Sequence, residues 1–119
     1  MQENLRKKGS FYEKAVGEYL QKKGYQVLEY NFRCRYSEID IIAKKEEYLV
    51  FCEVKFRQGN ELSIPLEAVT LQKQKRISKA ALYYLTTHGM LECPCRFDVI
   101  GVAGKEIIHI ENAFEYIGV

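Results

Sequence analysis

Two apolar segments joined by a short charged turn, within Ser37–Arg57, constrain the fold of this chain more than any other feature. Apolar and β-branched residues on both sides of Glu46–Glu47 are typical of a β-hairpin with a two-residue turn. That turn sets an antiparallel register in which Ile42 pairs with Phe51. A slip by one residue would scatter the apolar positions over both faces, so the pattern favours this register.

The same register places ionisable side chains in the most apolar part of the chain. Asp40 lies opposite Glu53, and Glu38 lies opposite Lys55, all on one face. The other face is expected to be wholly apolar and to belong to a core, with Ile39, Ile41, Ala43, Val50, Cys52 and Val54. Opposed carboxylates about 5 Å apart repel by roughly 3 kcal/mol at an effective dielectric constant near 20. The pattern therefore requires a nearby positive charge.

A divalent cation would supply that charge. The side chains of Glu38, Asp40, Glu53 and Lys55 together carry a formal charge of −2. Carboxylate oxygens without clustered His or Cys favour Mg²⁺, or Mn²⁺ in its place, over zinc. The alternative is a solvated ladder of charges on the exposed face of an antiparallel sheet.

Turn and capping signals divide the rest of the chain. The expected elements are a helix from Ser10 to Gly24, a strand over Tyr25–Asn31, a helix over Leu66–Thr87 between Pro65 and Gly89, and a hairpin of Arg96–Val102 and Glu106–Glu111 turned at Ala103–Lys105. The order is αβββαββ. We expect one domain, residues 1–119, of the α/β or α+β class, with helices packed on a mixed sheet.

Helical periodicity selects further side chains for the polar face. Glu13 falls beside the apolar stripe of the first helix and faces the body of the protein, although it also fits a capping box with Ser10. In the long helix, Lys73 and Gln74 flank the buried stripe and can approach the sheet. Lys75 and Lys79 point outward.

Charge and composition narrow the partners only slightly. The net charge is +2, but residues 1–37 hold eight Lys or Arg against four Glu. A basic arm suits nucleic acid, but on composition alone an ordinary solvated surface is the favoured interpretation. No apolar stretch approaches the roughly 20 residues of a membrane span, so we expect a cytoplasmic protein with no membrane partner. The four cysteines, Cys34, Cys52, Cys93 and Cys95, are expected to be reduced thiols.

Three segments together resemble a known nuclease signature: Glu13, Glu38–Ala43 and Val50–Arg57. They are similar to the PD-(D/E)xK motif as it occurs in the YraN-like family of small bacterial proteins, which is similar to archaeal Holliday junction resolvases. Further landmarks lie at Gly24–Tyr25, Asn31, Arg33, Ala68–Ile77, Arg96–Val99 and Asn112–Phe114. Two positions depart from the pattern, because Tyr12 and Ser37 stand where relatives usually have Gly.

The resemblance implies a restriction endonuclease-like fold with an αβββαβ core and a role for each motif residue. Asp40 and Glu53 would ligate Mg²⁺ together with the Val54 carbonyl. Lys55 would orient the attacking water, and Glu13 would hold a water or a second ion. Supporting roles fall to Glu38, Lys73 and Gln74, and contacts with the DNA backbone to Arg33, Arg35, Arg57, Lys75 and Lys79.

The leading hypothesis is therefore a metal-dependent nuclease that hydrolyses DNA phosphodiester bonds, with a junction or a flap among the candidate substrates. A junction resolvase needs two active sites, which leaves a homodimer open. The alternatives are a nucleic-acid-binding module of the same fold without turnover, and a structural domain. Asp98 is expected to be a strand-end or turn partner rather than a catalyst.

Overall fold

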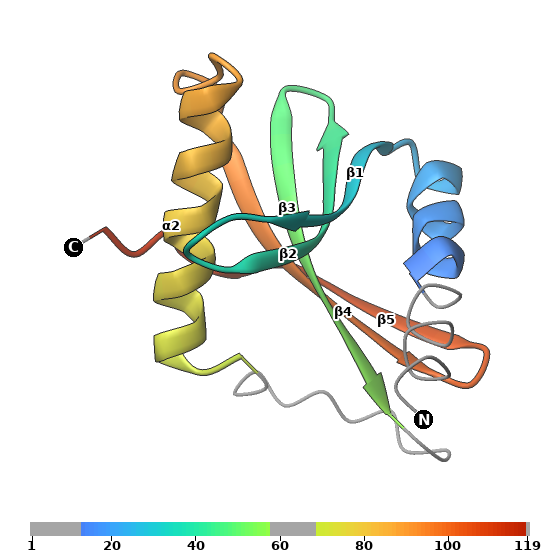
Figure 1. Ribbon diagram of the computed structural model, residues 1–119. Helices are drawn as coiled ribbons and strands as arrows, with labels where there is room; N and C mark the ends of the chain where they lie inside the picture. The colour runs from blue at the N-terminus through green and yellow to red at the C-terminus, as the bar shows by residue number, and fades with distance from the viewer. Residues whose placement is uncertain (1–12, 58–68, 119) are drawn as a thin grey trace.

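The computed structural model describes residues 13–57 and 69–118, which form a five-stranded mixed sheet between two helices (Figure 1). The strands are β1 (Gln26–Arg33), β2 (Glu38–Lys45), β3 (Tyr48–Arg57), β4 (Cys95–Ala103) and β5 (Glu106–Phe114), and they lie side by side in chain order. Among these five described strands, β3 and β4 form the one parallel pair, and the other neighbouring strands are antiparallel. A parallel pair needs a crossover, which contains α2 (Leu71–Thr87). The expected α+β class and the αβββαβ core are confirmed.

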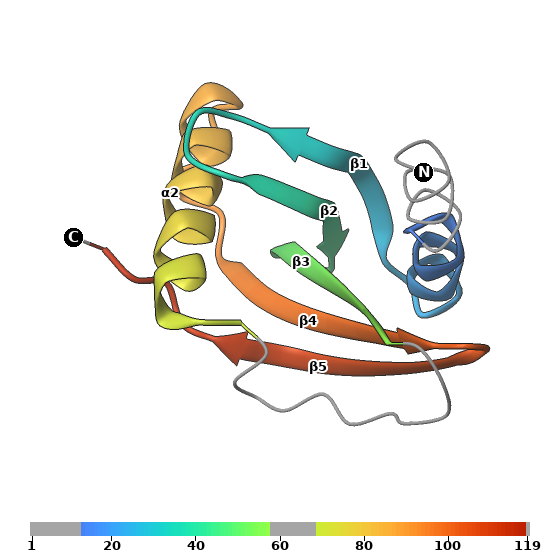
Figure 2. The ribbon, with the colours of Figure 1, turned by 60° about the horizontal axis from the view of Figure 1, so that its bottom comes forward.

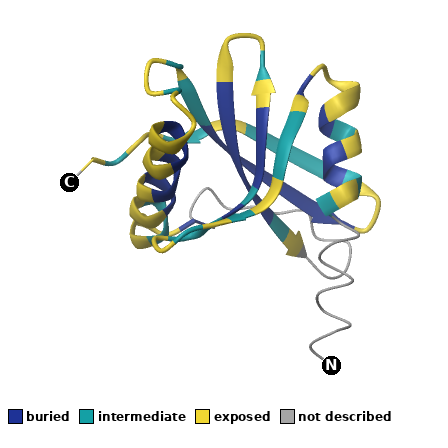
Figure 3. Cartoon of the chain, turned by 45° about the horizontal axis from the view of Figure 1, so that its top comes forward, coloured by how far each residue is buried: buried dark blue, intermediate teal, exposed yellow. Residues whose placement is uncertain are grey.

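The two helices cover opposite faces of the sheet (Figure 2). On one face, Ile42 and Phe51 pack with Ile77 of α2. On the other face, Val50 and Ile100 belong to a second cluster that includes Val16 and Leu20 of the N-terminal helix, residues 13–22. Figure 3 shows the buried strands between the exposed outer surfaces of the helices. The central strands are therefore apolar on both faces near the turn, and the polar side chains expected farther from the turn begin at Asp40.

The hairpin register is confirmed by the pairing of Ile42 with Phe51. Its turn is the expected Glu46–Glu47, where Glu46 has a φ of 54°. The predicted start of the long helix was wrong, because α2 begins at Leu71 rather than Leu66. Thr70 has extended backbone and its side chain accepts a hydrogen bond from Lys73 N, so it caps the helix. The expected capping residue Ser10 and the helix signal Pro65 lie outside the described residues.

The alternation of side chains breaks in β2. Ile41 packs with the N-terminal helix, whereas Ile39 packs with α2, although strand periodicity would place both on one face. The break lies beside Asn31 of the neighbouring β1, between the pairs Tyr30–Ile41 and Phe32–Ile39. Asn31 has a φ of 54°, a left-handed conformation that Asn tolerates better than most residues. This kink places Asp40 at a bend rather than on a flat sheet.

The sheet also forks at this point. The β2–β3 ladder ends at the pair Ile41–Cys52, while β1 and β2 stay paired as far as Arg33–Glu38. On the other branch, β3 stays paired with β4 as far as Arg57. Figure 2 shows β1 and β2 diverging from the other three strands. Polar side chains can therefore enter the sheet between β2 and β3.

Two further expectations concern the cysteines and the membrane. All four cysteines are free thiols, as the composition predicted. Across residues 13–57 and 69–118, no helix is both long enough and apolar enough to cross a membrane.

Candidate active site

Asp40 lies at the fork and is held by the main chain of the neighbouring strand. Its Oδ2 accepts a hydrogen bond from Val54 N at 2.8 Å. Burial raises the pKa of Asp40 above its usual range, the Val54 N–H opposes that rise, and the nearby charge of Glu38 adds to it. The carboxylate is thus fixed in place but only partly compensated for its lost hydration.

Glu53 is the second acid of the fork and is only 9% exposed. Burial, together with the nearby charge of Asp40, raises its pKa to about 7. Lys73 and Lys55 oppose the shift, and Lys55 Nζ lies 3.5 Å from Glu53 Oε1. The structure therefore brings Asp40, Glu53 and Lys55 together, as the sequence predicted.

The predicted cross-strand pair of Glu38 with Lys55 was wrong. Lys55 pairs with Glu53 of its own strand, and Glu38 pairs with Arg33 of β1, at 3.6 Å from Arg33 Nε. The reason is the fork. Counted from the turn, the β2–β3 ladder ends at Ile41, so that Glu38 is paired only with β1. Glu38 therefore belongs to the rim of the site.

Glu13 faces the fork, as its helical position predicted. Burial raises its pKa, a hydrogen bond from Asn31 opposes the rise, and the charges of Asp40 and Glu38 add to it. Its hydrogen bond with Asn31 thus joins the N-terminal helix to β1, and its carboxylate lies close enough to the acids of β2 to feel their charge. Sequence reasoning noted Asn31 only as a landmark and did not predict this hydrogen bond.

Lys73 is the supporting residue of α2 that reaches the site. Its Nζ lies 3.5 Å from Ser37 Oγ, and its charge lowers the pKa of both Asp40 and Glu53. Gln74 instead donates through Nε2 to the Val69 carbonyl at 3.0 Å, near the start of α2. Of the two predicted supporting residues of this helix, only Lys73 has a described interaction with the acids.

The predicted DNA contacts on described side chains are all exposed. These residues are Arg33, Arg35, Lys75 and Lys79, and the Arg33 side chain is 71% accessible. Arg57 ends β3, and the placement of its side chain lies outside the described part of the structure. Of the four exposed residues, Arg33 has a described ion pair at the rim of the site, with Glu38, so it joins Lys55 and Lys73 as a positive charge beside the acids.

The donor atoms of the fork fit a hard divalent ion. Glu13, Glu38, Asp40 and Glu53 contribute four negative charges, against three positive charges from Arg33, Lys55 and Lys73. Among the described residues, no group of three or more His, Cys, Asp or Glu side chains is arranged to hold a metal ion. An ion here would take carboxylate oxygens from Asp40 and Glu53, and would need main-chain oxygen and water as its remaining ligands, which suits Mg²⁺.

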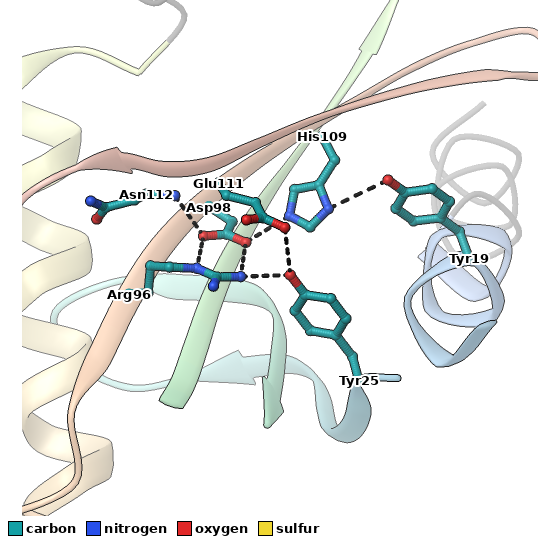
Figure 4. Close-up of polar contacts among 7 residues, drawn as sticks. All are labelled: Tyr19, Tyr25, Arg96, Asp98, His109, Glu111 and Asn112. Atoms are coloured by element: carbon teal, nitrogen blue, oxygen red, sulfur yellow. Dashed lines mark hydrogen bonds and ion pairs between the residues drawn. The ribbon is translucent and has the colours of Figure 1, made fainter. Parts of the chain in front are cut away.

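A second polar cluster, which sequence reasoning missed, surrounds Asp98 (Figure 4). Asp98 is fully buried in the middle of β4 and forms a bidentate pair with Arg96, with both distances 2.9 Å. It also accepts from His109 Nε2 at 2.6 Å and from Asn112 N at 3.0 Å. Burial would raise the pKa of Asp98, but the hydrogen bonds from His109 and Arg96 outweigh that effect and lower it. The expectation of a strand-end or turn partner was wrong.

This Asp98 cluster ties distant segments together. Arg96 Nη2 donates to the Tyr25 hydroxyl at 2.6 Å, and Tyr25 donates to Glu111 Oε1 at 3.1 Å. Tyr19 of the N-terminal helix lies 3.5 Å from His109 Nδ1 (Figure 4). The cluster therefore links β4, β5, the start of β1 and the helix that carries Glu13.

Comparisons with known proteins identify relatives along nearly the whole chain. The model of the uncharacterised protein family UPF0102 matches residues 12–102. A UPF0102 protein of Lachnoclostridium phytofermentans is 47% identical over 116 residues, which cover 97% of this chain and 98% of that protein. A UPF0102 protein of Clostridioides difficile is 44% identical over 113 residues, which cover 93% of this chain and 99% of that protein.

Proposed function

This chain belongs to the UPF0102 family, and from that premise and the geometry of the fork we propose that it is a metal-dependent nuclease that hydrolyses DNA phosphodiester bonds. Asp40 and Glu53 would hold Mg²⁺, with Mn²⁺ as a substitute. Lys55, Lys73 and Glu13 would complete the site. The proposal also draws on the resemblance of these residues to the PD-(D/E)xK signature.

One observation carries the proposal: two interacting carboxylates lie partly buried at the fork, with a lysine beside them. A main-chain N–H holds Asp40, and Glu53 is buried with its pKa raised to about 7. A purely structural pair of acids at this position would lower the stability of the fold, because Lys55, Lys73 and the Val54 N–H offset only part of the cost of burial. A bound cation would offset the cost of burying the two carboxylates.

The chemistry follows from the charges of the side chains. A divalent ion at Asp40 and Glu53 would polarise the scissile phosphate and lower the pKa of a nearby water molecule. The Lys55 ammonium, 3.5 Å from Glu53, would balance the negative charge that grows as water adds to phosphorus and the P–O bond to the leaving oxygen breaks. Lys73 would favour the ionised forms of Glu53 and Asp40, because its charge lowers the pKa of both.

The exposed basic side chains support DNA as the substrate. Arg33, Arg35, Lys75 and Lys79 are exposed, and Arg33 lies beside Glu38 at the rim of an acidic centre that would otherwise repel a phosphate backbone. Such contacts are independent of sequence, so affinity should fall steeply with salt.

A cleavage panel tests the proposal. Wild-type protein with Mg²⁺ is incubated with linear, flapped and four-way DNA beside two variants, Glu53→Gln and the exposed control Glu106→Gln. We expect cleavage of at least one substrate, a loss of about 100-fold or more in Glu53→Gln, and an unchanged rate in Glu106→Gln. Absence of cleavage, together with salt-dependent DNA binding that needs no Mg²⁺, would instead support a binding module without turnover.

A further inference from the structure

The outer surface of α2 carries a groove lined by aromatic side chains. It has a volume of about 550 Å³ and is lined in part by Tyr36, Leu82, Tyr83 and Tyr116. These four side chains are between 39% and 49% exposed. Figure 3 shows this surface of α2 as exposed along the helix. A cluster of large exposed side chains at a hollow indicates a binding surface.

Three segments of the chain build the groove and hold its rings in place. Tyr83 comes from α2, Tyr36 from the loop between β1 and β2, and Tyr116 from the segment after β5. The Tyr83 ring lies 6.3 Å from the Tyr36 ring and 6.4 Å from the Phe32 ring, measured between centroids. The C-terminal segment is fastened to α2 because Ile117 N donates to Ser78 Oγ at 3.0 Å. The aromatic faces are thus positioned before any ligand binds.

The charges beside the rings are positive. Lys79 lines the groove one helical turn before Tyr83. The Arg35 guanidinium lies 5.3 Å from the centroid of the Tyr36 ring. No acidic side chain is among the described residues that line the groove. Aromatic rings interleaved with cations are the features by which proteins bind single-stranded nucleic acid, through base stacking and phosphate contacts.

The groove is connected to the candidate active site. Tyr36 directly precedes Ser37, whose Oγ lies 3.5 Å from Lys73 Nζ. Lys73 precedes Lys79 by six residues of the same helix, a rise of about 9 Å. A strand with its phosphate at the fork would therefore reach the rings within a few nucleotides.

We propose that this groove binds the unpaired nucleotides of a DNA strand that enters the fork between β2 and β3. The inference rests on the proposed nuclease function and narrows its substrate to DNA with a single-stranded arm, such as a fork or a flap. Bases stack on Tyr36 and Tyr83, while Lys79 and Arg35 contact the phosphates on either side.

Binding measurements in EDTA test the groove separately from cleavage. The probes are a fluorescein-labelled forked DNA and a blunt duplex of the same sequence, followed by anisotropy. Wild type is expected to bind the forked DNA more tightly than the duplex. Tyr83→Ala is expected to lose at least about fivefold in affinity for the forked DNA, with little change in affinity for the duplex. Tyr83→Phe keeps a stacking ring and should retain the preference. Tyr48→Ala, which removes a similarly exposed tyrosine at the β2–β3 turn, is the matched control.

A fluorescent variant reports stacking directly. The chain contains no tryptophan, so Tyr83→Trp introduces a single indole whose emission oligo(dT) should quench. Absence of quenching, or equal affinity of wild type for fork and duplex, would overturn the groove proposal even in a protein that cleaves duplex DNA. A dimer that Tyr83→Ala converts to monomer without a change in DNA affinity would also overturn it. If Tyr83→Ala loses the preference for forked DNA, the groove proposal is supported even where no substrate is cleaved. The absence of cleavage would count only against the proposed nuclease function.

Discussion

The Asp40 carboxylate accepts a hydrogen bond from Val54 N at 2.8 Å, just beyond the last β2–β3 ladder pair, Ile41–Cys52. A side-chain oxygen thus takes over at the fork from the main-chain carbonyls that pair the strands up to that point. The bond requires an oxygen acceptor, whereas binding a cation requires a negative charge. The structural and chemical roles of Asp40 can therefore be separated by substitution.

Asp40→Asn should remove metal binding while preserving the fold, because the amide oxygen still accepts from Val54 N. We expect a free energy of unfolding within about 1 kcal/mol of wild type, and a loss of about 2 kcal/mol in Asp40→Ala, which leaves that N–H without its partner. Urea unfolding measures stability, and isothermal titration with Mg²⁺ measures binding. Wild-type Mg²⁺ affinity or cleavage in Asp40→Asn would remove the central assignment.

Glu53 should make the stability of the metal-free protein depend on pH. Its pKa rises from 4.5 to about 7, so between these values the folded protein holds a proton that the unfolded chain releases. Stability therefore falls as pH rises through this window, by up to about 3 kcal/mol for a shift of this size. Thermal unfolding should place Glu53→Gln above wild type at pH 8 and close to it at pH 4.5.

The Glu106→Gln control should follow the wild-type curve at both pH values, since that side chain is exposed at the start of β5. Added Mg²⁺ should stabilise wild type more at pH 8 than at pH 4.5, because the cation competes with the proton on Glu53. Equal stabilisation at both pH values would show that Mg²⁺ acts elsewhere.

Local pattern was sufficient to predict the hairpin and the meeting of Asp40 with Glu53. A two-residue turn sets the register, and the register places both acids on adjacent strands. The predicted pairing of Glu38 with Lys55 was wrong because β2 and β3 separate beyond the pair Ile41–Cys52, and a strand pattern does not encode where two strands separate. The predicted start of the long helix at Leu66 was wrong because Thr70 caps α2.

The Asp98 cluster was not predicted from the sequence for a different reason. Its partners His109 and Tyr25 become neighbours of Asp98 only when β5 pairs with β4 and the N-terminal helix covers that face. No spacing along the chain expresses those two contacts. The local signal was the opposite charges of Arg96 and Asp98, two residues apart on one strand that is otherwise apolar.

Lys73→Met should shift Mg²⁺ binding toward higher pH. The Lys73 charge lowers the pKa of Glu53 and Asp40, so its removal makes both carboxylates hold their protons more strongly. We expect Mg²⁺ affinity at pH 7 to fall severalfold and to recover as the pH is raised, as followed by calorimetric titration across pH. Lys75→Met removes an exposed lysine two residues away and should leave the pH profile in place. A parallel shift in both variants would point to a general loss of positive charge.

Asp98→Asn should destabilise the fold far more than the loss of an exposed ion pair. Removing the charge leaves Arg96 and His109 buried without their anionic partner, and such a change costs about 3 kcal/mol or more. Arg33→Ala breaks a pair whose side chains are 71% and 39% accessible, and should change stability by only about 0.5 kcal/mol. Because the pKa of Asp98 is lowered from 3.8, its contribution is complete above that pH and is lost as the pH falls below it. Urea unfolding of both variants at pH 7 and pH 3 measures the change in the free energy of unfolding. Equal effects of the two substitutions at pH 7 would show that the Asp98 cluster does not hold β4, β5 and the N-terminal helix together.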